Sequence, residues 1–203
     1  MLNICPRCGI HEIEKNIDPS GPFAICSSCH YAQPFLQLPL FVITGASGAG
    51  KSTVCLELAG RTRKECVILE TDIIWGIAPS PGDTFHNLWL RLAKNIGQAG
   101  MPVVLCGTAL PDYLESCPER RYFSTLYYLS LVCDDQILRE RLSSRPAWRN
   151  SHTESFIQHM IGFNLWLKEH AATTTPPMKL YDTGSTSLDQ TVNDVIQWIR
   201  ERL

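Results

Sequence analysis

A glycine-rich segment, Gly45–Thr53, holds the residues of this chain whose types and spacing are most specific for a chemistry. It matches G-x-x-x-x-G-K-[ST] and stands between an apolar run and a stretch with helical spacing of apolar residues. Glycines in this pattern let backbone N–H groups turn toward phosphate oxygens, and the following helix presents the positive end of its dipole to the same anion. The segment therefore predicts a nucleoside triphosphate site. The alternative is a glycine-rich turn without a ligand.

The side chains of this segment have different predicted roles. We expect Lys51 to reach the β- and γ-phosphates, the Ser52 hydroxyl to bind Mg²⁺, and Thr53 to donate to the α-phosphate. The other predicted nucleotide contacts are Gly45, Ser47, Gly48, Ala49 and Gly50. Such a segment predicts a phosphate donor site and leaves the reaction open.

Two C-x-x-C pairs near the amino terminus indicate a second chemistry. Cys5 and Cys8 are separated from Cys26 and Cys29 by a spacing typical of a tetrahedral Zn²⁺ site with four thiolate ligands. The surrounding segment has few large aliphatic residues, so we expect removal of zinc to unfold it. A redox dithiol stays open as an alternative.

The amino-terminal segment, residues 1–33, resembles a zinc ribbon built from two cysteine knuckles. A site in which His11 or His30 replaces one cysteine is a further alternative. Zinc ribbons often bind nucleic acid or partner proteins, but the basic residues here are only Arg7 and Lys15. A nucleic-acid partner is therefore not expected, although it is not excluded.

The composition indicates one well-cored domain plus this small appendage. The chain has 203 residues, 44% of them hydrophobic, and a formal charge of -2, so no global basic field favours polyanions. We divide it into residues 1–33, a linker over 34–39 and a nucleotide-binding domain over 40–203. With no signal-like start and no long apolar run, we expect a cytoplasmic protein without membrane contact and with reduced thiols. Five further cysteines are predicted to be core residues: Cys55, Cys66, Cys106, Cys117 and Cys133.

From residue 40 onward, short β-branched runs alternate with longer stretches of helical spacing, which is typical of an α/β fold with a parallel sheet. The predicted strands are 40–44, 66–70, 102–106, 126–132 and 178–182. The predicted helices are 51–63, 84–99, 134–144, 152–170 and 187–202. Asp134, Ser151 and Ser187 are the expected helix caps.

Asp72 follows the second predicted strand, so it should emerge at the sheet edge that also carries the glycine-rich segment. The alternative is that Asp72 only caps the next helical turn. Arginines concentrate before residue 150, where Arg145 and Arg149 flank a break in a helical pattern. Migrating negative charge needs cations that close over it, which favours these two residues. Arg139 is instead interpreted as part of a solvated helix face paired with Asp134, Asp135 and Glu140.

The chain from Phe41 onward resembles the small P-loop kinases of the nucleoside and nucleotide kinase group, including gluconate-kinase-like and antibiotic phosphotransferase-like relatives. The resemblance rests on the P-loop, on Leu69–Asp72, on Leu105–Thr108 and on the arginine series. It implies a P-loop NTPase three-layer sandwich with a five-stranded parallel sheet in the order 2-3-1-4-5 and a mobile lid.

This resemblance also implies residue roles. In similar kinases a carboxylate at the position of Asp72 accepts the proton of the acceptor hydroxyl or holds Mg²⁺ through water. We expect the first role for Asp72, with Glu70 a weaker candidate, and we expect Arg145 and Arg149 in the lid. Asp182 and Thr183 occupy the position where related kinases pass the adenine base. The expected acceptor pocket comprises Trp75, Phe85, His86, Trp89, Gly107 and Thr108, although Trp89 also fits a buried helical stripe.

The sequence thus predicts an ATP- and Mg²⁺-dependent kinase, with zinc in the ribbon, that phosphorylates a nucleoside, a nucleotide or a similar small molecule. One alternative is a nucleotide-dependent regulatory module whose ribbon engages a partner. Another is a polynucleotide end kinase, which the low basic content disfavours. The sequence predicts no oligomeric state.

Overall fold

The computed structural model describes residues 2–74 and 83–203, so Trp75 of the expected acceptor pocket lies outside the described residues. The strands are β1 (Asn16–Asp18), β2 (Phe23–Ile25), β3 (Ala32–Pro34), β4 (Leu40–Gly45), β5 (Val67–Glu70), β6 (Val103–Cys106), β7 (Leu126–Val132) and β8 (Met178–Asp182). The α-helices are α1 (Lys51–Arg61), α2 (Asp83–Gly97), α3 (Pro111–Glu115), α4 (Asp135–Ser143), α5 (Glu154–His170) and α6 (Leu188–Arg200). Four short 3-10 helices are η1 (Thr71–Ile74), η2 (Pro118–Tyr122), η3 (Ala147–Arg149) and η4 (Ala171–Thr173).

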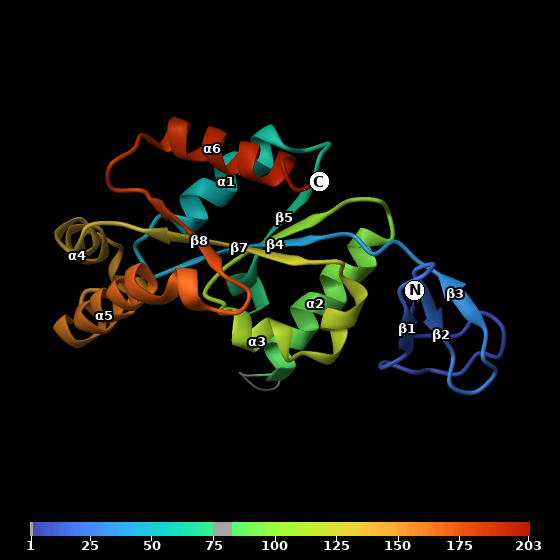
Figure 1. Ribbon diagram of the computed structural model, residues 1–203. Helices are drawn as coiled ribbons and strands as arrows, with labels where there is room; N and C mark the ends of the chain where they lie inside the picture. Colours follow the sequence, from blue (N-terminus) through green and yellow to red (C-terminus); the bar gives the residue numbers. More distant parts are fainter. Residues whose placement is uncertain (1, 75–82) are drawn as a thin grey trace.

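The larger sheet has five parallel strands in the order β5-β6-β4-β7-β8, which confirms the predicted order 2-3-1-4-5. Every residue of central strand β4 is buried, because helices cover both faces of the sheet. Phe41 and Ile43 pack in a core shared with α1 and α6. Leu40 and Val42 pack in a second core shared with α2, α3 and the end of α5. Figure 1 shows these three layers.

The predicted strands and long helices are confirmed to within about three residues at each end, whereas the short helix α3 was not predicted. Asp134 and Ser187 cap α4 and α6 as expected. The predicted cap Ser151 is wrong, because Thr153 caps α5. The Ser151 hydroxyl is instead buried and donates to the Leu142 carbonyl at the end of α4.

The five cysteines assigned to the core are all buried, as predicted. The expectation of reduced thiols is wrong for two of them, because Cys55 of α1 and Cys106 at the end of β6 form a disulfide. Their separation of 51 residues gives no spacing signal in the sequence. The contact arises because α1 packs across the carboxyl end of β6.

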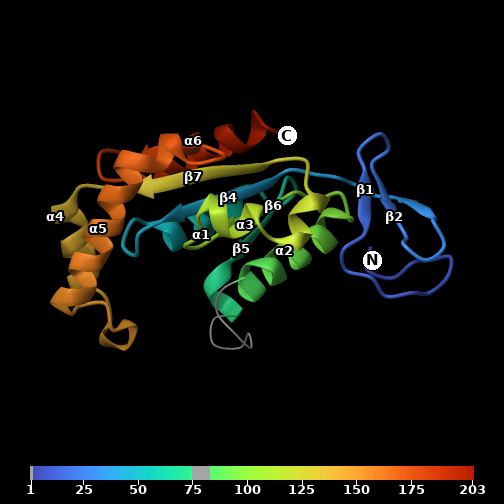
Figure 2. The same cartoon turned by 60° about the horizontal axis from the view of Figure 1, so that its bottom comes forward.

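The amino-terminal segment forms a three-stranded antiparallel sheet in the order β1-β2-β3. It lies beside the amino end of β4, and α4 and α5 lie at the opposite end of the molecule (Figure 2). Tyr122 of η2 completes its small core together with Leu2, Ala24 and Phe35. The Tyr122 hydroxyl also donates to the Ile13 carbonyl at 3.0 Å.

A buried charge network joins this segment to the larger domain. Glu119 of η2 accepts from Lys94 of α2 at 2.6 Å and from Arg91 at 2.8 Å, and the Glu119 and Lys94 side chains are fully buried. The Lys94 ammonium also donates to the Asn3 side chain at 2.5 Å and lies 4.2 Å from the centre of the Tyr122 ring. Helix α2 therefore contacts both the amino-terminal segment and the main sheet.

No helix in the described ranges is long and apolar enough to cross a membrane.

Replacing Glu119 by Gln should lower the free energy of unfolding by roughly 3–5 kcal/mol, because it leaves a buried ammonium without its counter-charge. Burial already lowers the pKa of Lys94 and Glu119 opposes that shift, so the deficit should shrink as the pH rises and Lys94 loses its proton. Urea unfolding across this pH range measures both effects.

The matched control is Glu65→Gln, which breaks the partly exposed pair of Glu65 with Arg200. It should cost no more than about 1 kcal/mol. Equal costs for the two variants would show that the Glu119 network does not carry the junction.

Candidate active site

The P-loop begins where β4 ends and closes at the first turn of α1. Gly50 is the residue before α1 and adopts a left-handed conformation with φ 96°, which side chains disfavour. At Gly45 a Cβ atom would lie 2.4 Å from the Leu131 carbonyl oxygen, so only glycine fits between β4 and β7. The backbone thus turns sharply at the carboxyl edge of the sheet and aims the start of α1 at the space above it.

Lys51 is held against the loop in this structure. Its ammonium donates to the carbonyl oxygens of Gly45 at 2.7 Å and of Ala46 at 3.1 Å. Burial lowers the pKa of Lys51 to about 8, with a smaller contribution in the same direction from the Arg145 cation, while the carboxylates of Asp72 and Glu70 oppose the shift. An anion beside Lys51 would restore the charged form.

A cavity of about 390 Å³ adjoins the loop, and most of the predicted site residues line it. These are Ser47, Gly48, Gly50, Lys51, Ser52, Thr53, Asp72, Arg145, Arg149 and Thr183. The other three predicted residues do not line it. Gly45 and Ala49 instead offer carbonyl oxygens to Lys51 and Thr183, and the Asp182 carboxylate accepts from the Gly184 N–H at 2.8 Å.

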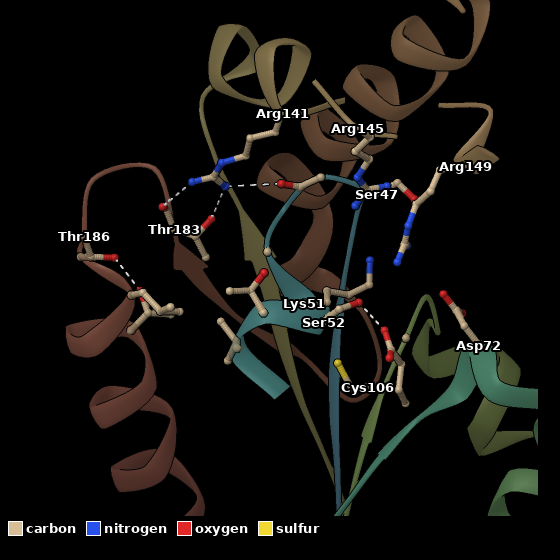
Figure 3. Close-up of a pocket in the computed structure, with 18 residues that line it drawn as sticks. Ser47, Lys51, Ser52, Asp72, Cys106, Arg141, Arg145, Arg149, Thr183 and Thr186 are labelled. Carbon is tan, nitrogen blue, oxygen red and sulfur yellow. Dashed lines mark hydrogen bonds between the residues drawn. The ribbon is translucent and has the colours of Figure 1, made fainter. Parts of the chain in front are cut away.

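The two carboxylates at the carboxyl end of β5, Glu70 and Asp72, have different surroundings. Glu70 accepts a short hydrogen bond from the Ser52 hydroxyl, whereas Asp72 is exposed on η1 and faces the cavity from the side opposite the arginines (Figure 3). We ranked Glu70 as the weaker candidate for the site. The contact between Glu70 and Ser52 follows from the strand order β5-β6-β4, in which β5 lies two positions from β4. The local sequence around Glu70 does not predict it.

Arg145 and Arg149 extend from the segment between α4 and α5 into the space over Lys51 (Figure 3). Burial, and next the Arg149 cation, lower the pKa of Arg145, and Asp72 opposes the shift. The three cations expected from the sequence, Lys51, Arg145 and Arg149, thus converge on one cavity. Arg139 points elsewhere and forms an ion pair with Glu154 of α5, with N–O distances of 2.7 and 2.9 Å, so its predicted pairing with Asp134, Asp135 and Glu140 is wrong in the partner.

Arg141 was not selected from the sequence, yet it also lines the cavity. Its guanidinium donates to the Thr183 hydroxyl and carbonyl, both at 3.1 Å, and to the Gly48 carbonyl at 3.4 Å. Thr183 in turn donates to the Ala49 carbonyl at 3.0 Å. The available signal was its place one helical turn before Arg145, which puts the two residues on one face.

The four paired cysteines converge at one point of the amino-terminal segment. Their Sγ atoms lie within 4.8 Å of one another, and the closest pairs are Cys5–Cys29 at 3.6 Å and Cys8–Cys26 at 3.7 Å. Tetrahedral Zn²⁺ with ordinary Zn–S bonds places sulfur atoms about 3.8 Å apart, so this donor set fits zinc. Gly9 and His30 close the two knuckles with φ 75° and 56°, which gives His30 a place in a turn rather than among the four ligands.

Comparison with protein families decides where the larger domain belongs. A family model described as an AAA domain matches residues 42–156, more than half of the chain. The chain belongs to this AAA-domain family. None of the curated proteins matches the chain in sequence.

Solved structures with the same fold include several kinases. A sugar kinase from Janibacter sp. HTCC2649 is similar with a TM-score of 0.58 and 16% identity, over 80% of this chain and 95% of its own. A gluconokinase from Sinorhizobium meliloti 1021 has a TM-score of 0.53 and 17% identity, over 82% and 94%. A shikimate kinase from Acinetobacter baumannii, bound to shikimate, has a TM-score of 0.50 and 17% identity, over 82% and 96%. At these identities the likeness shows a shared fold.

Binding of ATP should draw a proton onto Lys51 above pH 8. The triphosphate favours the ammonium form, whereas more than half of the free protein carries neutral Lys51 once the pH exceeds its pKa of about 8. We expect proton uptake approaching one per site at pH 9, little uptake at pH 7, and affinity falling by up to about tenfold per pH unit above 8. Calorimetry in two buffers of different ionisation enthalpy measures the uptake, and Lys51→Met should abolish both binding and uptake. Tight binding without uptake at pH 9 would contradict the prediction.

Zinc removal should unfold the amino-terminal segment, because its small core cannot offset the conformational entropy of ordering it. We expect one zinc per chain by elemental analysis, and loss of zinc in Cys26→Ser together with proteolytic cleavage before residue 39. Cys66→Ser is the control, since Cys66 is a buried free thiol outside the cluster and its loss should leave the zinc content unchanged. Full protease resistance of metal-free protein would rule out a zinc-dependent fold.

Proposed function

We propose that this protein is an ATP- and Mg²⁺-dependent kinase that transfers the γ-phosphoryl group to a small-molecule acceptor. The observation that carries the proposal is the convergence on one cavity of Lys51, of Asp72 and of the arginines Arg145 and Arg149. A P-loop alone serves many NTPases, whereas a free carboxylate facing converging cations supplies what phosphoryl transfer to a hydroxyl needs. The kinases among the structural neighbours support this interpretation.

The cation site has a suitable donor set. The hydroxyl of Ser52 and the carboxylate of Glu70 are oxygen ligands in contact with each other, which suits Mg²⁺. Bound magnesium would neutralise charge on the phosphate oxygens. Glu70 is thereby assigned to the metal side of the site, which leaves Asp72 for the acceptor.

We propose that Asp72, which lines the cavity, accepts the proton of the acceptor. In the proposed reaction the acceptor hydroxyl oxygen forms a bond to the γ-phosphorus as the bond from that phosphorus to the bridging oxygen of ADP breaks. The bridging electron pair leaves with ADP, and the hydroxyl proton passes to Asp72. Lys51, Arg145 and Arg149 stabilise the charge on the transferred group and exclude water as the lid closes.

The base of the nucleotide has a proposed path along the loop after β8. Thr183 lies on the cavity wall and is fastened to the P-loop through Ala49 and to α4 through Arg141. These contacts of Thr183 support the proposal that the adenine base passes along the backbone of Asp182 and Thr183.

The ribbon has a proposed structural role with one zinc. We retain the division at residues 1–33, 34–39 and 40–203 as a proposal. The ribbon lies at the end of the sheet opposite the P-loop, so it does not border the proposed site (Figures 1 and 2). This placement gives no support to a polynucleotide end kinase whose ribbon holds the reacting strand.

The kinase proposal is tested by ADP release from ATP and Mg²⁺ across nucleosides, nucleotides, sugars and aminoglycosides. An acceptor should raise ADP release above the acceptor-free rate. With that acceptor, Asp72→Asn should lower kcat at least about a hundredfold and leave nucleotide affinity unchanged. Glu70→Gln, the matched carboxylate variant, should instead raise the Mg²⁺ concentration needed for half-maximal rate.

If no acceptor raises ADP release and a partner protein does, the regulatory ATPase is the better assignment. If Asp72→Asn loses nucleotide affinity rather than turnover, Asp72 belongs to the metal site.

A further inference from the structure

The connection between α4 and α5, residues 144–153, is anchored near both of its ends. Leu142, close to the end of α4, packs in one core with Ala46 of the P-loop. Near the start of α5, the buried Ser151 hydroxyl donates to the Leu142 carbonyl at 3.3 Å. Figure 2 shows that the connection projects from the end of the two helices. The two lid arginines therefore extend from a short loop that is held against the P-loop.

A single 3-10 turn, η3, sets the backbone of this connection next to Arg149. The Arg149 N–H donates to the Pro146 carbonyl, and the Asn150 N–H donates to the Ala147 carbonyl, both at 3.0 Å. Asn150 then has φ 49°, a left-handed conformation that asparagine tolerates better than most residues. The turn fixes the backbone of Trp148 and Arg149, so the directions of these two side chains depend on their own contacts.

The Arg149 side chain lines the nucleotide cavity without a polar partner in the described part of the chain. It extends toward Lys51 from the same side as Arg145 (Figure 3). No hydrogen bond or ion pair joins its guanidinium to another described residue. Arg145 repels it, since the Arg149 cation is, after burial, the next cause of the lowered pKa of Arg145. A long side chain repelled by its neighbour would not keep this direction by itself.

The ring of Trp148 supplies an attraction. The guanidinium carbon of Arg149 lies 4.8 Å from the ring centre, within the range of a cation–π contact. Trp148 is 74% exposed, whereas Trp89 and Trp198 pack in the cores on the two faces of the sheet, which confirms the buried stripe expected for Trp89. Apolar burial therefore does not account for the place of Trp148. Its ring does not line the cavity, so any effect on the site must pass through Arg149.

On the basis of the proposed kinase function, we infer that Trp148 is a positioning residue for Arg149. Its ring face holds the guanidinium over the cavity against the repulsion of Arg145, so the arginine already faces the site when the nucleotide binds. A cation–π contact at an exposed position favours the paired arrangement roughly two- to fivefold. In this proposal Trp148 contacts neither the phosphates nor the acceptor.

The test uses the full chain with its zinc and begins with Trp148→Leu, which keeps an apolar side chain but removes the ring. In the ADP-release assay this variant should lower kcat about two- to fivefold and leave the acceptor KM unchanged. Trp148→Tyr restores a ring face and should recover most of the loss. In an Arg149→Ala background, Trp148→Leu should have no further effect, because the residue through which it acts is gone. A tyrosine variant no better than leucine overturns the inference.

A second readout needs no acceptor. Binding of ATP and Mg²⁺, measured by calorimetry, should weaken about two- to fivefold in Trp148→Leu and show no further loss when Arg149 is already alanine. This coupling without turnover of any acceptor would overturn the kinase function and leave the inference on Trp148 in place. Turnover of an acceptor without coupling in either measurement would overturn the inference while the kinase function stands.

The matched control is Trp166→Leu. Trp166 of α5 stacks on Phe163 and His170, at centroid distances of 6.3 and 5.2 Å, and does not line the cavity. The substitution removes the same ring from a helix that adjoins the connection, so it should leave kcat and ATP affinity unchanged. Thermal unfolding verifies that both leucine variants are folded, and equal effects of the two substitutions overturn the inference.

Discussion

The parallel pairing of β4 with β6 and of β6 with β5 is the constraint on which the site depends. Parallel strands end at a common edge, so the P-loop after β4, Glu70 at the end of β5, Asp72 just beyond it, and Gly107 after β6 must meet there. Apolar burial on both faces holds this register, because a shift of one residue would turn Phe41 and Ile43 away from their own core. The positions of the site residues at this edge are thus fixed by the packing of helices on both faces of the sheet, and those helices' core residues take no part in the chemistry.

The converging cations give this edge its electrostatic character. Lys51 and Arg145 both have lowered pKa values, chiefly because they are buried and also because a second cation lies near each of them. Such an arrangement is unfavourable without an anion, and a polyphosphate relieves it. Arg141 differs from these residues, since its guanidinium donates hydrogen bonds to the oxygens of Thr183 and Gly48. It thereby links two segments that line the cavity.

Much of the fold was readable from sequence, because strands such as Leu40–Gly45 are apolar throughout and the helices have clear spacing and caps. The P-loop was readable for a similar reason, since its geometry requires particular residues at fixed intervals. Contacts between elements were not. Three contacts depend on how the helices pack against the sheet, which no local sequence pattern encodes. They are the hydrogen bond of Ser52 to Glu70, the disulfide of Cys55 with Cys106, and the hydrogen bonds of Arg141 to Thr183. Ser151 was wrongly predicted as a helix cap for the same reason, because its hydroxyl donates to the Leu142 carbonyl of α4 in the folded protein.

At the junction between the amino-terminal sheet and η2, the boundary indicated by sequence composition differs from the boundary of the packed core. By composition the ribbon ends near residue 33. Tyr122 nevertheless packs in its core, and the Lys94 ammonium donates a hydrogen bond to the Asn3 side chain. A chain cut at the linker would leave Tyr122 and the Glu119 network facing water on one piece and an incomplete core on the other. A ribbon of this kind cannot be transferred to another protein by itself, because the larger domain must also supply residues equivalent to Tyr122, Lys94 and Glu119.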